Sequence, residues 1–208
     1  MENSANDTYK TITGLSTAQF KDRGSRFIGF LFPVSSEEDI RQRLAALKKE
    51  YHDATHHCYA YTVGHIDAEN IRMNDDGEPS GSAARPIYGQ LQSAELRDVL
   101  AVVVRYFGGV KLGVPGLINA YKTTTRLCVE QAETVEKRVM EIASARFPYD
   151  RMNTLLTLLK KEQADIRRMD YDGTQSVIEF GIRRSRYEAL CRNIALLPFA
   201  SLIHQGTE

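Results

Sequence analysis

The spacing of hydrophobic residues predicts alternating strands and helices in the first two thirds of the chain. Residues 8–14 and 16–34 have strand character, and both faces are apolar from Phe27 to Phe32, which is typical of a strand buried on both sides. Residues 55–63 predict another strand. Residues 98–107 hold a continuous apolar, β-branched run, so we expect the central strand of a sheet there.

Three helices are predicted between these strands. Ser36 followed by acidic residues is typical of a helix start, and apolar residues repeat at helical spacing as far as Tyr51. A second helix is expected to begin after a cap at Ser80 or Ser82. The third follows a glycine-rich loop and has one apolar face, formed by Leu117, Tyr121, Thr124 and Cys128.

The last third of the chain has a regular pattern that predicts a separate domain. After a polar boundary near residues 133–138, the order is strand, helix, strand, strand, helix, strand, with a hairpin turn at Asp172-Gly173. This is the ferredoxin-like βαββαβ arrangement. The predicted fold class is therefore α+β, with one domain over residues 1–135 and a ferredoxin-like domain over residues 136–208.

Composition excludes several classes of function. Among 208 residues, 27 are Lys or Arg and 27 are Asp or Glu, so nucleic acid is expected to bind only through a local patch. The 3 cysteines are far apart, which indicates neither a zinc site nor a disulfide framework. No apolar run is long enough for a membrane span, and the polar start of the chain lacks a signal peptide. We expect a cytoplasmic protein without a membrane partner.

The loop after the central strand is the first candidate site. It contains Gly108, Gly109, Gly113 and Gly116, with Arg105 before it and Lys111 within it. One interpretation is an anion cradle, in which backbone amides at the helix start and the two basic side chains face a phosphate; the other is a tight turn that leads into the helix through Pro115. The loop matches neither a P-loop nor a dinucleotide fingerprint, so no cofactor is expected.

An acidic loop is the second candidate. Asp75, Asp76 and Glu78 lie close together but lack the ligand spacing of a calcium loop. We therefore predict no metal site and interpret these carboxylates as groups that orient Arg85 or Arg105. His56 and His57 are neighbours on a strand, so their side chains point to opposite faces. The sequence contains no G-x-S-x-G nucleophile motif.

A basic cluster in the last third forms a second candidate patch. Arg183, Arg184 and Arg186 lie at a predicted helix start, where positive charge is unfavourable against the helix dipole. Bound phosphate would compensate this charge. The alternative is a solvated helix face without a ligand.

Four motifs follow one another along the chain: Ser25-Arg26-Phe27-Ile28, residues 56–61, residues 75–81 and residues 103–113. Together they resemble the IMPACT family, which includes the bacterial YigZ-type proteins. The resemblance covers residues 8–135 and implies a first domain similar to the ribosomal-protein domain-2 superfold and a second similar to the ferredoxin-like C-terminal domain of elongation factor G. Eukaryotic members of the family are translation regulators, and for bacterial members the resemblance implies RNA or ribosome binding.

Three hypotheses of function follow. The first is a non-catalytic cytoplasmic protein that binds RNA or the ribosome and is linked to the regulation of translation. The second is a hydrolase, peptidase-like or metal-assisted, that uses Asp76, Glu78 and His57. The third is a protein-interaction module with a protein partner. In the first, phosphates are expected to meet Arg26, Arg85, Arg105 and Lys111, and a base is expected to stack on Tyr106 or His57.

Overall fold

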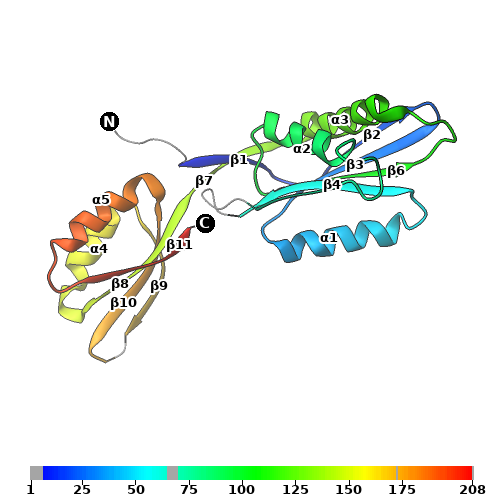
Figure 1. The fold of residues 1–208 in the computed structure, drawn as a ribbon. Coiled ribbons are helices and arrows are strands. Elements are labelled where there is room, and N and C mark those ends of the chain that lie inside the picture. Colours follow the sequence, from blue (N-terminus) through cyan, green and yellow to red (C-terminus); the bar gives the residue numbers. More distant parts are fainter. Residues whose placement is uncertain (1–6, 65–69, 172, 208) are drawn as a thin grey trace. The chain divides into compact units, whose positions relative to one another are not determined.

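The computed structural model describes residues 7–64, 70–171 and 173–207. The chain divides into two compact units. The larger unit spans Tyr9–Lys137, and the smaller unit joins the start of the chain, up to Thr8, to the segment from Arg138 onward. Strands and helices are mixed in both units (Figure 1). Within the described ranges, no helix is long and apolar enough to cross a membrane.

The larger unit is built on a five-stranded antiparallel sheet in the order β2-β3-β6-β4-β5. Helix α1 covers one face of this sheet, and α2 and α3 cover the other (Figure 1). A separate pair of strands, β1 and β7, forms a two-stranded sheet. The elements are β1 Thr8–Ile12, β2 Ser16–Asp22, β3 Ser25–Pro33, α1 Glu37–Glu50, β4 His56–Val63, β5 Asn70–Asn74, α2 Ala84–Ser93, β6 Val99–Tyr106, α3 Gly113–Gln131 and β7 Thr134–Arg138.

The helices on both faces explain why the central strand β6 is apolar at every position from Val99 to Val104 (Figure 1). Along β6, Val99, Ala101 and Val103 pack into the core beneath α2 and α3. The alternate residues Leu100 and Val102 pack into the core beneath α1. Successive side chains of a strand point to opposite faces, so a strand between two helical layers needs apolar residues at every position.

The structure corrects three predictions about the larger unit. The run predicted over residues 16–34 is a hairpin, because the chain turns at Arg23 and Gly24, which both have positive φ values (44° and 80°). Such values at both turn positions suit a two-residue hairpin loop. Neither β5 nor β7 was predicted. Both are short, fully exposed strands; β7 has no apolar alternation, whereas Ile71 and Met73 of β5 alternate with polar residues, so β5 did have a strand signal. Finally, neither Ser80 nor Ser82 caps α2; its first amides bond to Asp75.

The smaller unit has a four-stranded antiparallel sheet in the order β11-β8-β10-β9. Helices α4 and α5 pack on one face of this sheet over a core that includes Phe147, Leu155, Phe180 and Leu190. Of the predicted hairpin turn, Asp172 lies outside the described residues. The elements are β8 Met140–Pro148, the 3₁₀ turn η1 Tyr149–Arg151, α4 Met152–Lys161, β9 Asp165–Tyr171, β10 Gln175–Arg183, α5 Arg184–Ala195 and β11 Ser201–Thr207.

Candidate functional site

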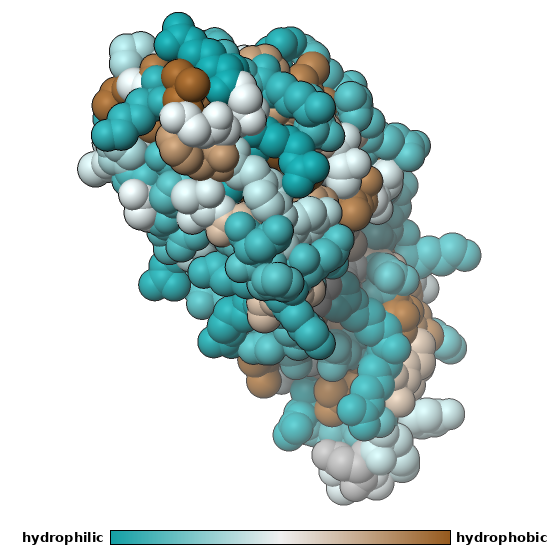
Figure 2. Space-filling view, turned by 90° about the vertical axis from the view of Figure 1, so that its right-hand side faces the viewer, coloured by the Kyte–Doolittle hydropathy of each residue, from teal (hydrophilic) through white to brown (hydrophobic). Residues whose placement is uncertain are grey.

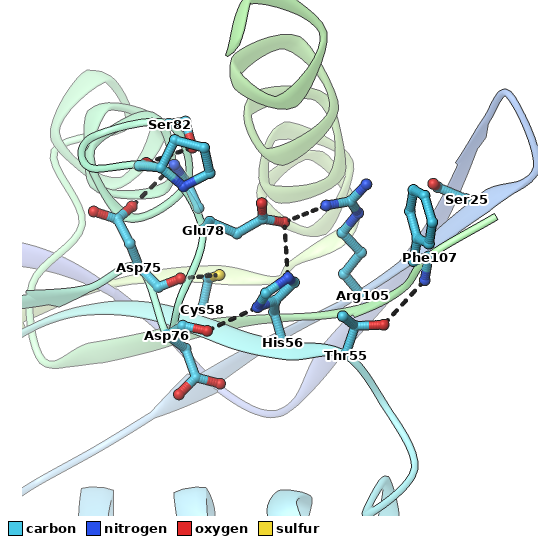
Figure 3. Close-up of polar contacts among 12 residues, drawn as sticks. Ser25, Thr55, His56, Cys58, Asp75, Asp76, Glu78, Ser82, Arg105 and Phe107 are labelled. Carbon is cyan, nitrogen blue, oxygen red and sulfur yellow. Dashed lines mark hydrogen bonds and ion pairs between the residues drawn. The ribbon is translucent and has the colours of Figure 1, made fainter. Parts of the chain in front are cut away.

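A buried ion pair between Glu78 of the acidic loop and Arg105 of β6 lies at the centre of the candidate site (Figure 3). An Nη of Arg105 donates to Oε1 of Glu78 at 2.6 Å, and the hydroxyl of Tyr121 donates to the same oxygen at 2.8 Å. The side chains of Arg105 and Glu78 are only 6% and 3% exposed. Arg105 is therefore held inside the protein and does not face solvent as an anion-binding residue would. Its guanidinium fixes the acidic loop against β6.

His56 and Cys58 complete this network from β4. Nε2 of His56 lies 3.8 Å from Oε1 of Glu78, and its Nδ1 is 2.8 Å from the carbonyl oxygen of Asp76. The thiol of Cys58 lies 3.0 Å from the carbonyl oxygen of Asp75 and 3.3 Å from the Tyr121 hydroxyl. Burial raises the pKa of both the Cys58 thiol and the Tyr121 phenol. Both groups stay protonated, so Cys58 is not an activated nucleophile.

The carboxylates of the acidic loop accept hydrogen bonds from other groups of the protein. The Asp75 carboxylate accepts hydrogen bonds from the backbone amides of Gly81, Ala83 and Ala84 at 2.8, 3.0 and 2.8 Å. It thereby satisfies free amides at the start of α2, as a helix cap does. Over the part of the chain that the structure describes, no group of three or more His, Cys, Asp or Glu side chains is arranged to hold a metal ion.

His57 does not reach the ion pair, because it lies on the other face of the sheet. Its amide donates to the Asp76 carboxylate at 2.7 Å, and Nδ1 of its ring is 3.9 Å from the same carboxylate. The residue is 7% exposed. Burial lowers the pKa of His57, and the nearby Asp76 offsets this only in part. The histidine beside Glu78 is thus His56, and a buried His57 cannot stack on a base.

Arg26 and Tyr106 also lie on that opposite face and contact each other. They are paired positions on β3 and β6, and the Arg26 guanidinium lies over the Tyr106 ring, 4.5 Å from its centroid. The Tyr106 hydroxyl donates to Asp53 at 2.7 Å. The predicted stacking residue therefore already has one face covered, and it does not share a surface with Arg105.

The β6–α3 loop is fixed at its start by two hydroxyl groups. The amide of Phe107 donates to Oγ1 of Thr55 at 3.2 Å, and the amide of Gly108 donates to Oγ of Ser25 at 3.1 Å. A Cβ atom on Gly108 would lie 1.9 Å from the carbonyl carbon of Gly24, so the loop and the β2–β3 turn touch through backbone alone. Gly108 is required for this packing, and an anion cradle is not needed to explain it.

The remainder of the loop is exposed. Gly109 and Gly113 adopt positive φ values of 84° and 72°, and Lys111 between them is exposed, as is Arg85 at the start of α2. Helix α3 begins at Gly113 and includes Gly116; among the described residues, no side chain caps it and none in its first turn is acidic. Figure 2 looks onto this end of the unit and shows apolar side chains separated by hydrophilic ones. The exposed apolar residues of the loop and α3 are Phe107, Val110, Val114 and Ile118.

The second basic patch is compensated by carboxylates of the smaller unit. Arg183 forms an ion pair with Asp7, and Nε of Arg184 lies 3.5 Å from Glu141. The Asp7 carboxylate also accepts a hydrogen bond from the backbone amide of Ser185 at 2.9 Å, at the start of α5. The unfavourable charge at this helix start is thus balanced within the protein. Arg186 is half-buried.

Sequence reasoning did not identify several residues that build this site. Thr55 and Ser25 hold the loop, Tyr121 shares the Glu78 carboxylate, and Cys58 lies beside them. Ser25 and Cys58 lie within the motifs of the family resemblance, and Tyr121 was expected at a core position on α3, but none of the three had been given a role in the site. A buried aromatic hydroxyl usually finds a hydrogen-bond partner, which could have directed attention to Tyr121.

The family match to known proteins falls within the larger unit. The family described as the Impact N-terminal domain matches residues 23–129. The chain is 35% identical over 164 residues to the "IMPACT family member YvyE" of Bacillus subtilis, covering 79% of this chain and 75% of that protein. It is 33% identical over 185 residues to an "IMPACT family member" of Haemophilus influenzae, covering 88% and 89%.

More distant similarity extends to eukaryotes and to a solved structure. The rabbit (Oryctolagus cuniculus) "Protein IMPACT" is 31% identical over 115 residues, covering 54% of this chain and 36% of that protein. A solved structure described as "Crystal structure of an hypothetical protein" has a TM-score of 0.72 at 25% identity, covering 96% of this chain and 98% of that one. The matched residues include the acidic loop, the buried ion pair and the β6–α3 loop. The chain belongs to the IMPACT family.

Proposed function

We propose that this protein is a non-catalytic cytoplasmic protein that binds RNA and associates with the ribosome, with a role in regulating translation. We assign residues 1–135 to a ribosomal-protein domain-2-like fold and residues 136–208 to a ferredoxin-like fold. The order and pairing of the strands in the smaller unit support the second assignment. Likeness of fold alone is weak support for a function, so the proposal depends on the surface chemistry of the larger unit.

One observation carries the proposal: the start of α3 differs from the start of α2. Asp75 fills the start of α2 with a carboxylate. In the described structure, the start of α3 has no side-chain cap and no acidic residue in its first turn, and the exposed Lys111 lies just before it. Free amides at a helix start attract anions. A phosphate of RNA would satisfy these amides and pair with Lys111.

A salt titration of RNA binding tests this proposal. The affinity for a fluorescent RNA oligonucleotide should fall with rising salt, because bound phosphates release counterions. Lys111→Ala should weaken binding and reduce the magnitude of the log–log salt slope by about 0.7. Lys49→Ala is the matched control, because Lys49 is exposed on α1. Equal slopes for Lys111→Ala and the parent protein, or no binding at low salt, would refute the proposal.

The geometry does not favour the hydrolase hypothesis. Asp76 and His57 lie together on one face of the sheet, whereas Glu78 lies on the other with Arg105. Figure 3 shows the Asp76 side chain pointing away from Glu78. A general base must lie within hydrogen-bonding reach of the proton that it removes. Glu78 instead has both Arg105 and Tyr121 on one oxygen.

The exposed apolar residues beside the loop favour the protein-interaction hypothesis as the second candidate. Val110, Val114 and Ile118 are 50%, 47% and 39% exposed, and Val114 and Ile118 are four residues apart on α3 and so lie on the same side of the helix. A pull-down with and without nuclease treatment distinguishes the candidates. A partner that stays bound after RNA is digested would support the protein-interaction hypothesis.

A further inference from the structure

Phe107 is an exposed aromatic residue on a backbone that cannot move freely. The residue is 47% exposed. Its own amide is bonded to Thr55 and the next amide, of Gly108, is bonded to Ser25. The same loop is pressed against Gly24 by backbone contact. The ring is therefore presented to solvent from a fixed base, which is an arrangement that preorganises a binding residue.

Arg105 supports the Phe107 ring from inside the protein. The guanidinium carbon of Arg105 lies 5.5 Å from the centroid of the buried Phe27 ring and 5.5 Å from that of Phe107. Its ion pair with Glu78 holds it in place. Guanidinium groups attract aromatic faces at such distances. Phe27, Arg105 and Phe107 thus form a layered arrangement, with one side of the outermost ring supported and the ring half exposed.

Two exposed basic residues belong to the backbone segments that meet beside Phe107. Lys111 follows in the same loop, and Arg23 precedes Gly24 at the tip of the β2–β3 turn that contacts Gly108. Asp22 of the same turn is half-buried. The sequence separates Arg23 from the loop by about eighty residues, so only the hairpin contact brings the two together. An exposed aromatic ring on a surface that also carries exposed basic residues is the chemistry that binds a nucleotide through its base and its phosphates.

We infer that Phe107 is a stacking platform for an unpaired base, so that the ligand of this surface is single-stranded RNA and not a duplex. The inference rests on the proposed function and adds the class of RNA. In a double helix the base faces are covered by their neighbours, and side chains meet mainly phosphates and 2′-hydroxyls. Only an unpaired base can place its face on the exposed ring while its phosphates meet Lys111 and Arg23.

Tryptophan fluorescence gives a direct test. The chain contains 0 tryptophans, so Phe107→Trp places a single reporter at the proposed platform. Single-stranded oligo(A) or oligo(U) RNA should quench this fluorescence because a base covers the indole. Duplex RNA and inorganic polyphosphate should not, because neither offers an unpaired base. A duplex that quenches as strongly as a single strand, or a single strand that binds without quenching, would overturn the inference.

Binding measurements on a second variant keep the test independent of the reporter. Phe107→Ala should weaken binding of the single strand by about 5- to 150-fold, the range for loss of one stacked base. Phe107→Tyr should restore it. Met73→Ala is the matched control, since Met73 on β5 is also 47% exposed. Circular dichroism of each variant should match the parent.

The outcomes separate the inference from the proposed function. One outcome is that Lys111→Ala changes the salt slope of single-strand binding while Phe107→Ala binds the single strand as tightly as the parent protein. This outcome overturns the stacking platform and leaves the RNA-binding proposal standing. If the parent protein binds no RNA at low salt, both fail.

Discussion

Replacing Glu78 with alanine should leave a buried guanidinium without its counter-charge. The Arg105 side chain is 6% exposed and its ion pair with Glu78 is 2.6 Å long. Removing one partner of a buried pair costs about 3–5 kcal/mol, because the remaining charge stays desolvated. The Tyr121 hydroxyl also loses its acceptor. We therefore expect Glu78→Ala to destabilise the larger unit by several kcal/mol, while Glu78→Gln, which keeps an acceptor for Tyr121, should cost less.

Hydrogen exchange measures this effect within one unit of a two-unit chain. Amides of β4 and β6, the strands that carry His56 and Arg105, report the opening free energy of the larger unit. A loss of about 3–5 kcal/mol corresponds to exchange that is faster by about two to four orders of magnitude. Amides of β8 and β10 in the smaller unit serve as an internal reference and should change little.

A double replacement tests the physical cause. If the cost comes from the unpaired charge, Glu78→Leu combined with Arg105→Met should be less destabilising than Glu78→Ala alone, because no buried charge remains. The reasoning is refuted if Glu78→Ala costs less than about 1 kcal/mol, a value typical of an exposed pair. It is also refuted if the double variant is as unstable as the sum of the two single variants.

Three further predictions concern the scaffold of the site. Gly108→Ala should lower the free energy of unfolding by about 3 kcal/mol, because the added Cβ would lie 1.9 Å from the backbone of Gly24. Gly89→Ala on α2, where a Cβ would have nothing within 4 Å, should instead raise the free energy of unfolding by up to about 1 kcal/mol. Urea denaturation of the two variants compares these effects. Asp75→Ala should cost about 1–2 kcal/mol through loss of the α2 cap, seen as faster exchange at the start of that helix, and unchanged exchange there would contradict the cap. Burial lowers the pKa of His57, so as the pH falls the unfolded chain binds a proton at this residue before the folded chain does. The stability of the protein should therefore fall as the pH drops below about 6.5. The melting temperature of His57→Gln should depend less on pH than that of the parent protein, and identical pH profiles would contradict this prediction.

The helices and strands that pack into the cores were largely predictable from the sequence. Apolar residues at every position from Val99 to Val104 indicated a strand between two layers, and Ser36 with its acidic neighbours correctly indicated the start of α1. These patterns are local, because strand alternation and helix capping are fixed by residues close in the chain. The exposed strand β7 carries no such pattern and is paired with β1 far away in the chain, whereas the short alternation of Ile71 and Met73 in β5 was not recognised as a strand.

The site itself was only partly visible in the sequence. The two loops, and the idea that the acidic loop orients a basic residue, came from residue types and spacing alone. The sequence could not tell that His56 and not His57 faces Glu78, because alternation puts the two on opposite faces without saying which face is which. Nor could it show that Tyr106 is covered by Arg26 while Phe107 is exposed.

The family motifs, the buried strands and the position of the glycine-rich loop can all be recognised in the sequence. The roles of the residues in and beside that loop became clear only from the fold. It buried Arg105 against Glu78, used Gly108 to let the loop touch the β2–β3 turn, and left Phe107 and Lys111 exposed. These roles could not be read from the sequence, because the burial and pairing of a side chain depend on partners that are far apart in the chain. A charged or aromatic residue type is compatible with either role until those partners are in place.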